Sequence, residues 1–156
     1  MHNTAMNLQH VSIRHPLSRT EFMPSLKYFC RLAIRFKTIY ALSSGALPSA
    51  IAVVRISGDR SEEALRRLTR RANFEPMRMF YSKLFDEHGK VLDHAMACFM
   101  KAPKTFTGEN CVELYLHGSR AVVNAVFATL ARMPELESAK AGEFSKRHLR
   151  FLIEKI

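Results

Sequence analysis

The chain has 156 residues, 47% of them hydrophobic, which is enough for one globular domain and short for two. No run of about 18 apolar residues occurs, so we expect neither a membrane-spanning helix nor a membrane partner. The net charge of +10 favours an anionic partner or an import signal and does not indicate a fold.

A basic leader occupies residues 1–37 and carries half of the excess charge. Within residues 25–37, Lys27, Arg31 and Arg35 recur every four residues, and apolar side chains lie largely on the opposite side of the predicted helix. A basic amphipathic helix with few acidic residues is typical of a mitochondrial presequence, so we predict location in the mitochondrial matrix. A surface helix of the folded domain is the alternative interpretation.

Two strand-like segments follow the leader. Residues 38–42 are rich in β-formers, and residues 50–57 are a near-continuous apolar run interrupted only by Arg55. Such a run predicts a strand that is buried on both faces. Gly45 and Pro48 predict a turn between the two strands.

A helix is predicted next, over residues 61–72. Asp59 and Glu62 have the spacing of a capping box, with Asp59 as the N-cap. Four arginines near the end of this helix suit its dipole, and we interpret them as a solvated face. They are Arg66, Arg67, Arg70 and Arg71.

The rest of the chain predicts a hairpin, a strand and two helices. The order β-β-α-β-β-β-α-α predicts an α+β domain with a mixed or antiparallel sheet and flanking helices. In the last helix, Leu149, Leu152 and Ile153 either pack on the domain or lie exposed. The predicted strands are 79–86, 91–101 and 111–116, and the predicted helices are 119–133 and 143–156.

Several familiar sites are missing from the sequence. It contains no GxxxxGK[ST] phosphate loop, no HExxH and no metal-ligand spacing of Cys and His, so we expect this chain neither to bind GTP nor to act alone as an enzyme. The odd set Cys30, Cys98 and Cys111 fits buried thiols in a reducing compartment. His117 is interpreted as a strand-end histidine that bonds to backbone.

Two charged residues, Arg55 and Glu113, interrupt strongly apolar strands. An unpaired charge is costly to bury, so each side chain needs a partner or a site. They either pair with each other or face a ligand, because a carboxylate accepts two parallel hydrogen bonds and a guanidinium forks onto a carboxylate or carbonyl. The pairs 108–109 and 142–143, both Gly-Glu, are interpreted as ordinary turn and helix-start features.

Three stretches together resemble one family. They are TIYALSSG with AIAVVRISG, then VLDHAMACFMKAPKTFTGENCVELYLHGS, then AKAGEFSKR. They are similar to the N-terminal domain of the TrmE/MnmE tRNA-modification GTPases, in the eukaryotic mitochondrial branch. The match covers residues 38–147 and departs from the family signature at Asn110 and Ser119. Residues 148–156 are then expected to be a divergent, truncated C-terminal helix.

The resemblance implies a tetrahydrofolate-binding fold that forms a homodimer. Arg55 and Glu113 match the family's folate contacts, so it implies that they hold 5-formyl- or 5,10-methylene-tetrahydrofolate. It further implies that the protein works with a flavin-binding subunit of the MnmG/GidA type to modify C5 of the wobble uridine of certain tRNAs. Contact of this domain with tRNA is expected to be indirect.

The chain also departs from the family pattern. In the family, a third folate contact is a lysine in a GKLDL-like segment. Its place in this chain falls near Ile153, with Lys155 close by. In addition, residues 46–50 replace a glycine-rich cationic turn of the family. Two alternatives therefore stay open. One is a purely structural, dimerising module of a truncated isoform that does not bind folate, and the other is an independent folate-dependent one-carbon transferase.

Overall fold

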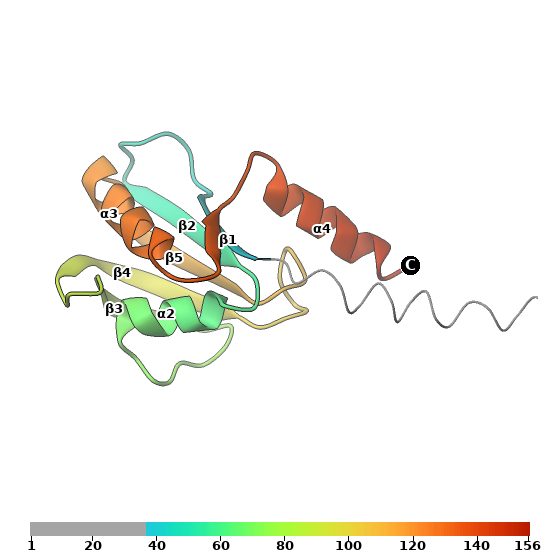
Figure 1. Ribbon diagram of the computed structural model, residues 1–156, viewed down its shortest axis with the longest axis horizontal. Helices are drawn as coiled ribbons and strands as arrows, with labels where there is room; N and C mark the ends of the chain where they lie inside the picture. The colour runs from blue at the N-terminus through green and yellow to red at the C-terminus, as the bar shows by residue number, and fades with distance from the viewer. Residues whose placement is uncertain (1–36) are drawn as a thin grey trace, which may run out of the picture. The chain divides into compact units, whose positions relative to one another are not determined.

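A six-stranded mixed sheet organises residues 37–156, the part of the chain that the computed structural model describes (Figure 1). The predicted presequence therefore lies outside the described residues, except for Lys37. The strand order is β3-β4-β5-β2-β1-β6, with antiparallel neighbours except for the parallel pair of β1 and β6. The strands are β1 Thr38–Leu42, β2 Ile51–Ser57, β3 Met79–Phe85, β4 Val91–Met100, β5 Cys111–His117 and β6 Leu136–Ser138.

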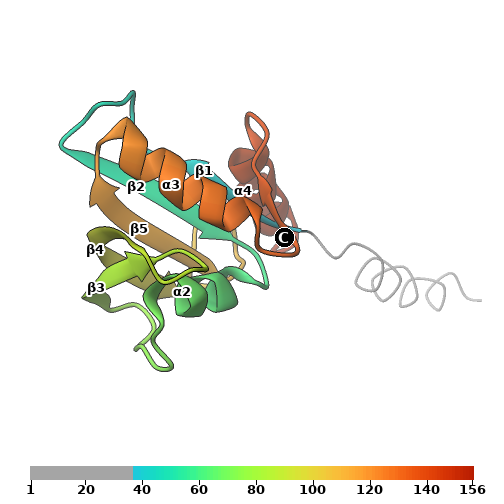
Figure 2. The ribbon, with the colours of Figure 1, turned by 60° about the vertical axis from the view of Figure 1, so that its left-hand side comes forward.

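Two helices, α2 (Ser61–Thr69) and α3 (Arg120–Ala131), lie on the same face of the sheet (Figures 1 and 2). Leu65 and Leu68 of α2 and Leu130 of α3 are completely buried. Burial of each such side chain stabilises the fold by roughly 1.5–3 kcal/mol. This confirms the predicted α+β class, with a mixed sheet and its core on the helical side.

The strand β2 is buried on one face only. Ala52, Val54 and Ile56 point into the core and are fully buried, whereas Val53 and Arg55 alternate with them and stay partly exposed. The prediction of burial on both faces was wrong, because α2 and α3 cover one side of the sheet. The other side of the sheet is not covered by α2 or α3, and the candidate functional site lies on that side.

The start of α2 differs from the predicted capping box. Arg60 is the N-cap and makes no side-chain cap, and its backbone N–H instead donates to Thr38 Oγ1 at 2.9 Å. The N-cap is therefore Arg60 and not the predicted Asp59, and Thr38 of β1 holds the backbone at this point. The helix ends at Thr69, three residues before the predicted end, because Arg70 adopts a left-handed conformation with φ of 55°.

The short strand β6 was not predicted. Its three residues follow Glu135, which has a φ of 67°, and pair in parallel with β1. Beyond the strand, the Ala139 N–H donates to the Tyr40 carbonyl at 2.9 Å. Three residues are too few to show a period in sequence, and the neighbouring β1 supplies the hydrogen bonds that make this segment a strand.

The last helix, α4, runs over Glu143–Ile153. Leu149, Leu152 and Ile153 are 59%, 44% and 61% exposed, so the structure favours the exposed alternative for these side chains. In residues 37–156, no helix has the length and apolar character needed to cross a membrane. Cys98 and Cys111 are buried free thiols, as predicted, while Cys30 lies outside the described residues.

Candidate functional site

Arg55 and Glu113 face each other across the pair of strands β2 and β5. Arg55 Nε and Nη2 donate to Glu113 Oε1 at 2.9 and 2.6 Å. The side chains are 27% and 15% exposed. The structure thus brings together the two residues that the sequence analysis selected, and they form the ion pair that was one of the two interpretations.

The second oxygen of Glu113 accepts a hydrogen bond from the Tyr115 hydroxyl at 2.6 Å. This bond, with burial and the carboxylate charge, raises the pKa of Tyr115 to about 12. Cys98 lies opposite Glu113 on β4, and burial together with that charge raises the pKa of its thiol. Glu113 therefore sits at the centre of a polar cluster on the face of the sheet that the helices leave uncovered.

Phe106, in the loop between β4 and β5, connects this cluster to α4. The Arg55 guanidinium lies 5.5 Å from the centre of the Phe106 ring. The His148 ring stacks on Phe106 at 4.2 Å, and its Nδ1 lies 2.5 Å from the Phe106 carbonyl oxygen. An aromatic side chain therefore borders the ion pair, and its position depends on the placement of the last helix.

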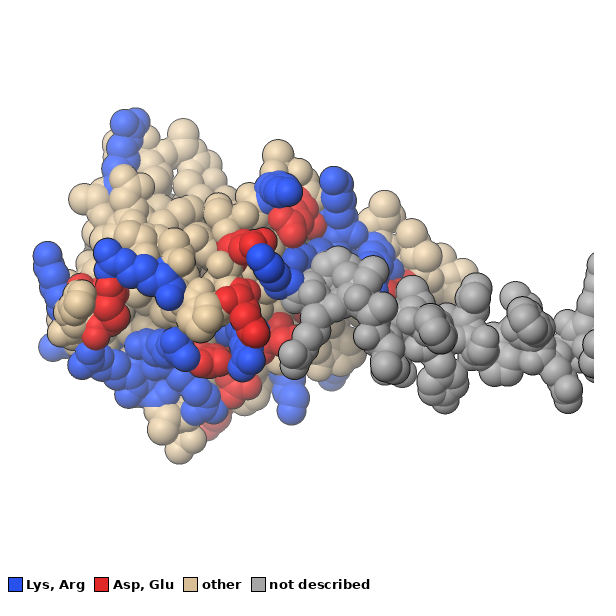
Figure 3. All heavy atoms as spheres, viewed as in Figure 1, with Lys and Arg blue, Asp and Glu red and all other residues tan. Residues whose placement is uncertain are grey.

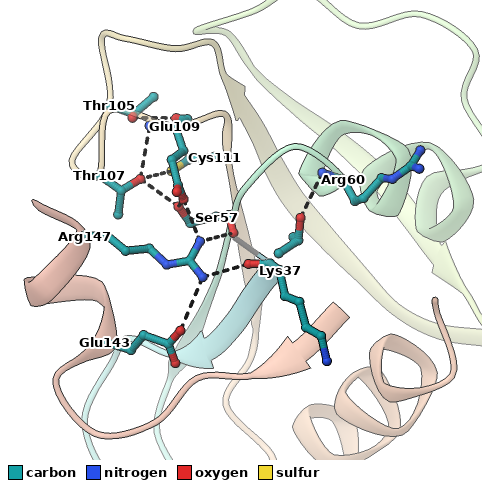
Figure 4. A network of polar contacts seen from close by, with 10 residues as sticks. Lys37, Ser57, Arg60, Thr105, Thr107, Glu109, Cys111, Glu143 and Arg147 are labelled. Carbon is teal, nitrogen blue, oxygen red and sulfur yellow. Dashed lines mark hydrogen bonds and ion pairs between the residues drawn. The ribbon is translucent and has the colours of Figure 1, made fainter. Parts of the chain in front are cut away.

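A second arginine, Arg147, lies at the centre of a network that fixes this placement (Figure 4). Its Nη1 donates to Glu109 Oε2 at 2.8 Å, and its Nη2 donates to the Lys37 carbonyl at 2.7 Å. Nη2 also contacts Glu143 Oε1 at 3.3 Å, and the Ser57 hydroxyl donates to Glu109 at 2.7 Å. The Arg147 side chain is only 7% exposed. It joins α4 to the loop after β4, to the end of β2 and to the start of β1.

Arg147 was not predicted from the sequence to be a structural centre. Glu109 and Glu143, expected to be ordinary turn and helix-start residues, both bind this arginine. The available signal was the repeated Gly-Glu pattern, because Gly108 and Gly142 both have a φ of 75°. Each of these glycines allows the turn that aims the next carboxylate at Arg147.

A small cavity of about 140 Å³ lies between the loop after β4 and α4. Arg147 and Glu109 line it together with Phe151, whose ring occupies the space where a side chain at Gly108 would be. Within the described residues, no group of His, Cys, Asp and Glu could hold a metal ion. The candidate site consists of hydrogen-bonding groups, an ion pair and an aromatic ring.

The remaining candidates lie elsewhere. His117 ends β5 as predicted, but its Nδ1 pairs with Asp93 Oδ1 at 2.7 Å and not with backbone. Ile153 is exposed at the end of α4, and Lys155 Nζ lies 4.3 Å from the Phe151 ring centre. The described contacts do not bring Lys155 to Arg55 or Glu113.

Comparison with known proteins places these features in a family context. The sequence model described as "GTP-binding protein TrmE N-terminus" matches residues 38–153. Proteins called "tRNA modification GTPase MnmE" are similar over most of the chain. The one from Zymomonas mobilis is 46% identical over 112 residues, and the one from Chelativorans sp. is 50% identical over 113 residues. These matches cover 71% and 70% of the chain but 26% and 25% of the relatives, so the chain spans about a quarter of their length.

Proposed function

The chain belongs to the TrmE N-terminal family, and on this premise we propose that it is the folate-binding, dimerising module of a tRNA-modification GTPase. The observation that supports folate binding is the Arg55–Glu113 pair on the uncovered face of the sheet, beside the Phe106 ring. A carboxylate with a neighbouring guanidinium suits the amidine-like N–H edge and carbonyl of a pterin ring.

The residues present fit such a ligand. Glu113 would accept hydrogen bonds from the ring N–H groups, and Arg55 would donate to the carbonyl and balance the charge. Phe106 would cover one side of the ring, and His148 keeps this phenyl group in place. Bound 5-formyl- or 5,10-methylene-tetrahydrofolate would supply the one-carbon unit. The alternative, a purely structural module, is favoured by the fact that Arg55 and Tyr115 already occupy both oxygens of Glu113.

Calorimetric titration of the protein with 5-formyltetrahydrofolate separates the two functions. We expect saturable binding that Arg55→Ala and Glu113→Ala each weaken about tenfold or more, as for removal of a charge-assisted hydrogen bond. The matched control is the Arg66–Glu62 pair on α2, on the other side of the sheet, whose ion-pair distance of 2.7 Å is close to the 2.6 Å of Arg55–Glu113. Alanine at either control residue should leave folate binding unchanged. Absence of heat and saturation at millimolar ligand would exclude folate binding and leave the structural module.

The uncovered face of the sheet supports the proposed homodimer. Ile51, Met79 and Tyr81 expose 58%, 48% and 60% of their surface on this face. Met79 and Tyr81 are on the edge strand β3, and Ile51 is on β2, which β4 and β5 separate from β3. Exposed apolar side chains spread over one sheet face in this way are typical of an interface. We expect Tyr81→Glu to convert a dimer to a monomer in light scattering, while Leu152→Glu on α4 has no such effect. A monomeric mass of the unchanged protein across micromolar concentrations would contradict the proposal.

The family relation supports a role in tRNA modification. We propose that the module acts with an MnmG/GidA-type flavin-binding subunit on C5 of the wobble uridine, and that GTP is handled by a domain outside these 156 residues. A chimaera in which residues 38–153 replace the matching segment of a bacterial relative should keep wobble-uridine modification, measured by mass spectrometry of tRNA. A folded chimaera without modification would contradict this role.

The basic leader supports import into the mitochondrial matrix. Residues 1–37 fused to a fluorescent protein should direct it to mitochondria, because a cationic amphipathic helix is the import signal. Replacing Lys27, Arg31 and Arg35 by Gln should abolish this location. Equal targeting by the neutral variant would show that the basic face has no such role.

A further inference from the structure

Arginine and aromatic side chains gather at the end of α2 and along β3, far from the folate candidate. Figure 3 shows Lys and Arg atoms concentrated over α2 and the neighbouring hairpin. We call this region the arginine–aromatic surface. It comprises Arg66, Arg70, Arg71, Phe74, Phe80 and Phe85.

Each arginine of this surface lies against a phenyl ring. The Arg71 guanidinium is 4.9 Å from the Phe80 ring centre, and Arg70 is 4.9 Å from that of Phe85. Phe74 stacks on Phe80 at 5.9 Å with an interplanar angle of 8°. A ring holds a guanidinium in place without using its N–H donors, so these donors stay available to a ligand.

The two central arginines, Arg70 and Arg71, are exposed and make no direct ion pair within residues 37–156. Carboxylates lie nearby, because Glu75 borders the same hollow as Arg71, and Asp86 and Glu87 border the same hollow as Arg70. Their neighbours differ, because Arg67 pairs with Glu63 and Arg132 pairs with Glu87. Two ordered positive charges with free donor edges therefore remain at the end of α2.

The two arginines border separate hollows. Arg71 lines one of about 380 Å³ together with Asn73, Glu75 and Phe80. Arg70 lines another of about 270 Å³ together with Phe85, Asp86 and Glu87. Phe80 and Phe85 are five positions apart on β3, roughly 17 Å along an extended strand. Because each guanidinium lies against one of these rings, two phosphate groups of one chain suit the two arginines better than a single phosphate group.

The chemistry of this surface favours a single-stranded nucleic acid over a membrane. Guanidinium groups bind phosphates through their N–H edges and stack on unpaired bases through their planes. The apolar residues Ala64, Leu65 and Leu68 of α2 are buried against the sheet, so the helix exposes no large apolar side chain for insertion into a bilayer.

We propose that the arginine–aromatic surface binds a single-stranded RNA segment, with Arg70 and Arg71 on successive parts of the phosphate chain. This goes beyond the proposed function, in which contact with tRNA is indirect, and it does not depend on folate binding. Phe80 and Phe85 act as positioning residues, because their rings contact and orient the guanidinium groups of Arg71 and Arg70.

Fluorescence anisotropy with a labelled oligouridylate tests the proposal on the full chain. An oligonucleotide about 12 nucleotides long lies within the ~4–16 nucleotide range of single-strand sites. We expect Arg70→Gln with Arg71→Gln to raise Kd about tenfold and to lower the slope of log K against log salt by about 1.4, or ~0.7 for each phosphate that is no longer neutralised. Phe80→Leu should raise Kd about fivefold, because the Arg71 guanidinium loses the ring that orders it.

The matched control is Lys140→Gln with Lys146→Gln, which removes the same charge from two exposed positions beyond β6, at the opposite edge of the sheet. It should leave Kd unchanged, and all variants should keep wild-type calorimetric behaviour toward 5-formyltetrahydrofolate. An equal loss of affinity in the control pair, or an unchanged Kd in the double arginine variant, would overturn the proposal. So would binding to phosphatidylserine vesicles that requires Arg70 and Arg71 while the oligouridylate does not bind.

Discussion

Arg55 and Arg147 both bind glutamates, yet their surroundings differ. Arg55 pairs with Glu113 on a face of the sheet without helices and keeps 27% of its side chain exposed. Arg147 is 7% exposed and joins Glu109 and Glu143 beneath α4. The first pair lies where a ligand can reach it, while the second connects segments that are far apart in sequence.

The difference shows that an ion pair acquires its role from burial and from the segments it joins. The Arg55–Glu113 contact links strands that already share a ladder of hydrogen bonds, so the fold needs it little. The Arg147 contacts span 38 residues to Glu109 and 110 residues to the Lys37 carbonyl. We therefore expect Arg147 to determine stability and Arg55 to determine binding.

The largest expected effect is that of Arg147→Met. Removing the cation leaves Glu109 and Glu143, which are about a quarter exposed, without their partner. We expect the free energy of unfolding in urea to fall by about 3 kcal/mol, the low end for breaking a buried pair. The neighbouring exposed Lys146→Met should change it by less than about 0.5 kcal/mol. A decrease below about 1 kcal/mol at Arg147 would remove the distinction between the two arginines.

Gly108→Ala should come next, with Gly142→Ala as its matched control. Both glycines have a φ of 75°, which costs a residue with a Cβ about 1 kcal/mol. A Cβ at position 108 would lie 2.1 Å from the Phe151 ring, whereas nothing lies within 4 Å at position 142. We expect Gly108→Ala to lower the free energy of unfolding by about 2–3 kcal/mol, and Gly142→Ala to lower it by about 1 kcal/mol.

The Phe151→Ala background tests this cause directly. Without the ring, the two glycine substitutions should cost the same amount. A difference that persists in this background would mean that the contact between the loop and α4 is not its origin.

A smaller effect is expected at the partly buried pair Arg55–Glu113, which joins two strands that are already paired. Arg55→Ala and Glu113→Ala should each cost about 1 kcal/mol, and a double-mutant cycle should give a coupling free energy of about 1 kcal/mol. The equivalent cycle for Arg66 and Glu62, a pair within one helix, should give at most about 0.5 kcal/mol. A coupling of about 3 kcal/mol or more for Arg55 and Glu113, by the same unfolding assay, would place this pair with Arg147 as a structural contact.

The smallest expected effect concerns pH. The hydrogen bond to Glu113 raises the pKa of Tyr115 from 10.0 to about 12. Because the folded-state pKa lies above the ordinary one, its stabilisation is complete below pH about 10 and is lost as the pH rises toward about 12. Burial also raises the pKa of Tyr40, so near-ultraviolet absorbance should show a late tyrosinate change whose amplitude Tyr115→Phe lowers by one tyrosine. If Tyr115→Phe instead removes amplitude near pH 10 and leaves the late change intact, Tyr115 does not donate to Glu113 in solution.

Much of the fold could be predicted because its signals are local. Apolar runs interrupted by charge predicted β2 and β5, a helical apolar stripe predicted α3, and Gly142 preceded the predicted last helix. The same interruptions, Arg55 and Glu113, identified the candidate site before any geometry was known. Errors arose where a distant residue contributed, as at the start of α2, where Arg60 is the N-cap and its N–H donates to Thr38 of β1.

The sequence by itself determined the family, the order of the main elements and the two charges on the sheet. Each of these depends on neighbouring residues or on a continuous motif. Only the tertiary structure decided that Arg55 and Glu113 pair, that β6 completes the sheet and that Arg147 joins α4 to the loop after β4. Such contacts connect residues tens of positions apart, and their partners are fixed only when the sheet brings those segments together.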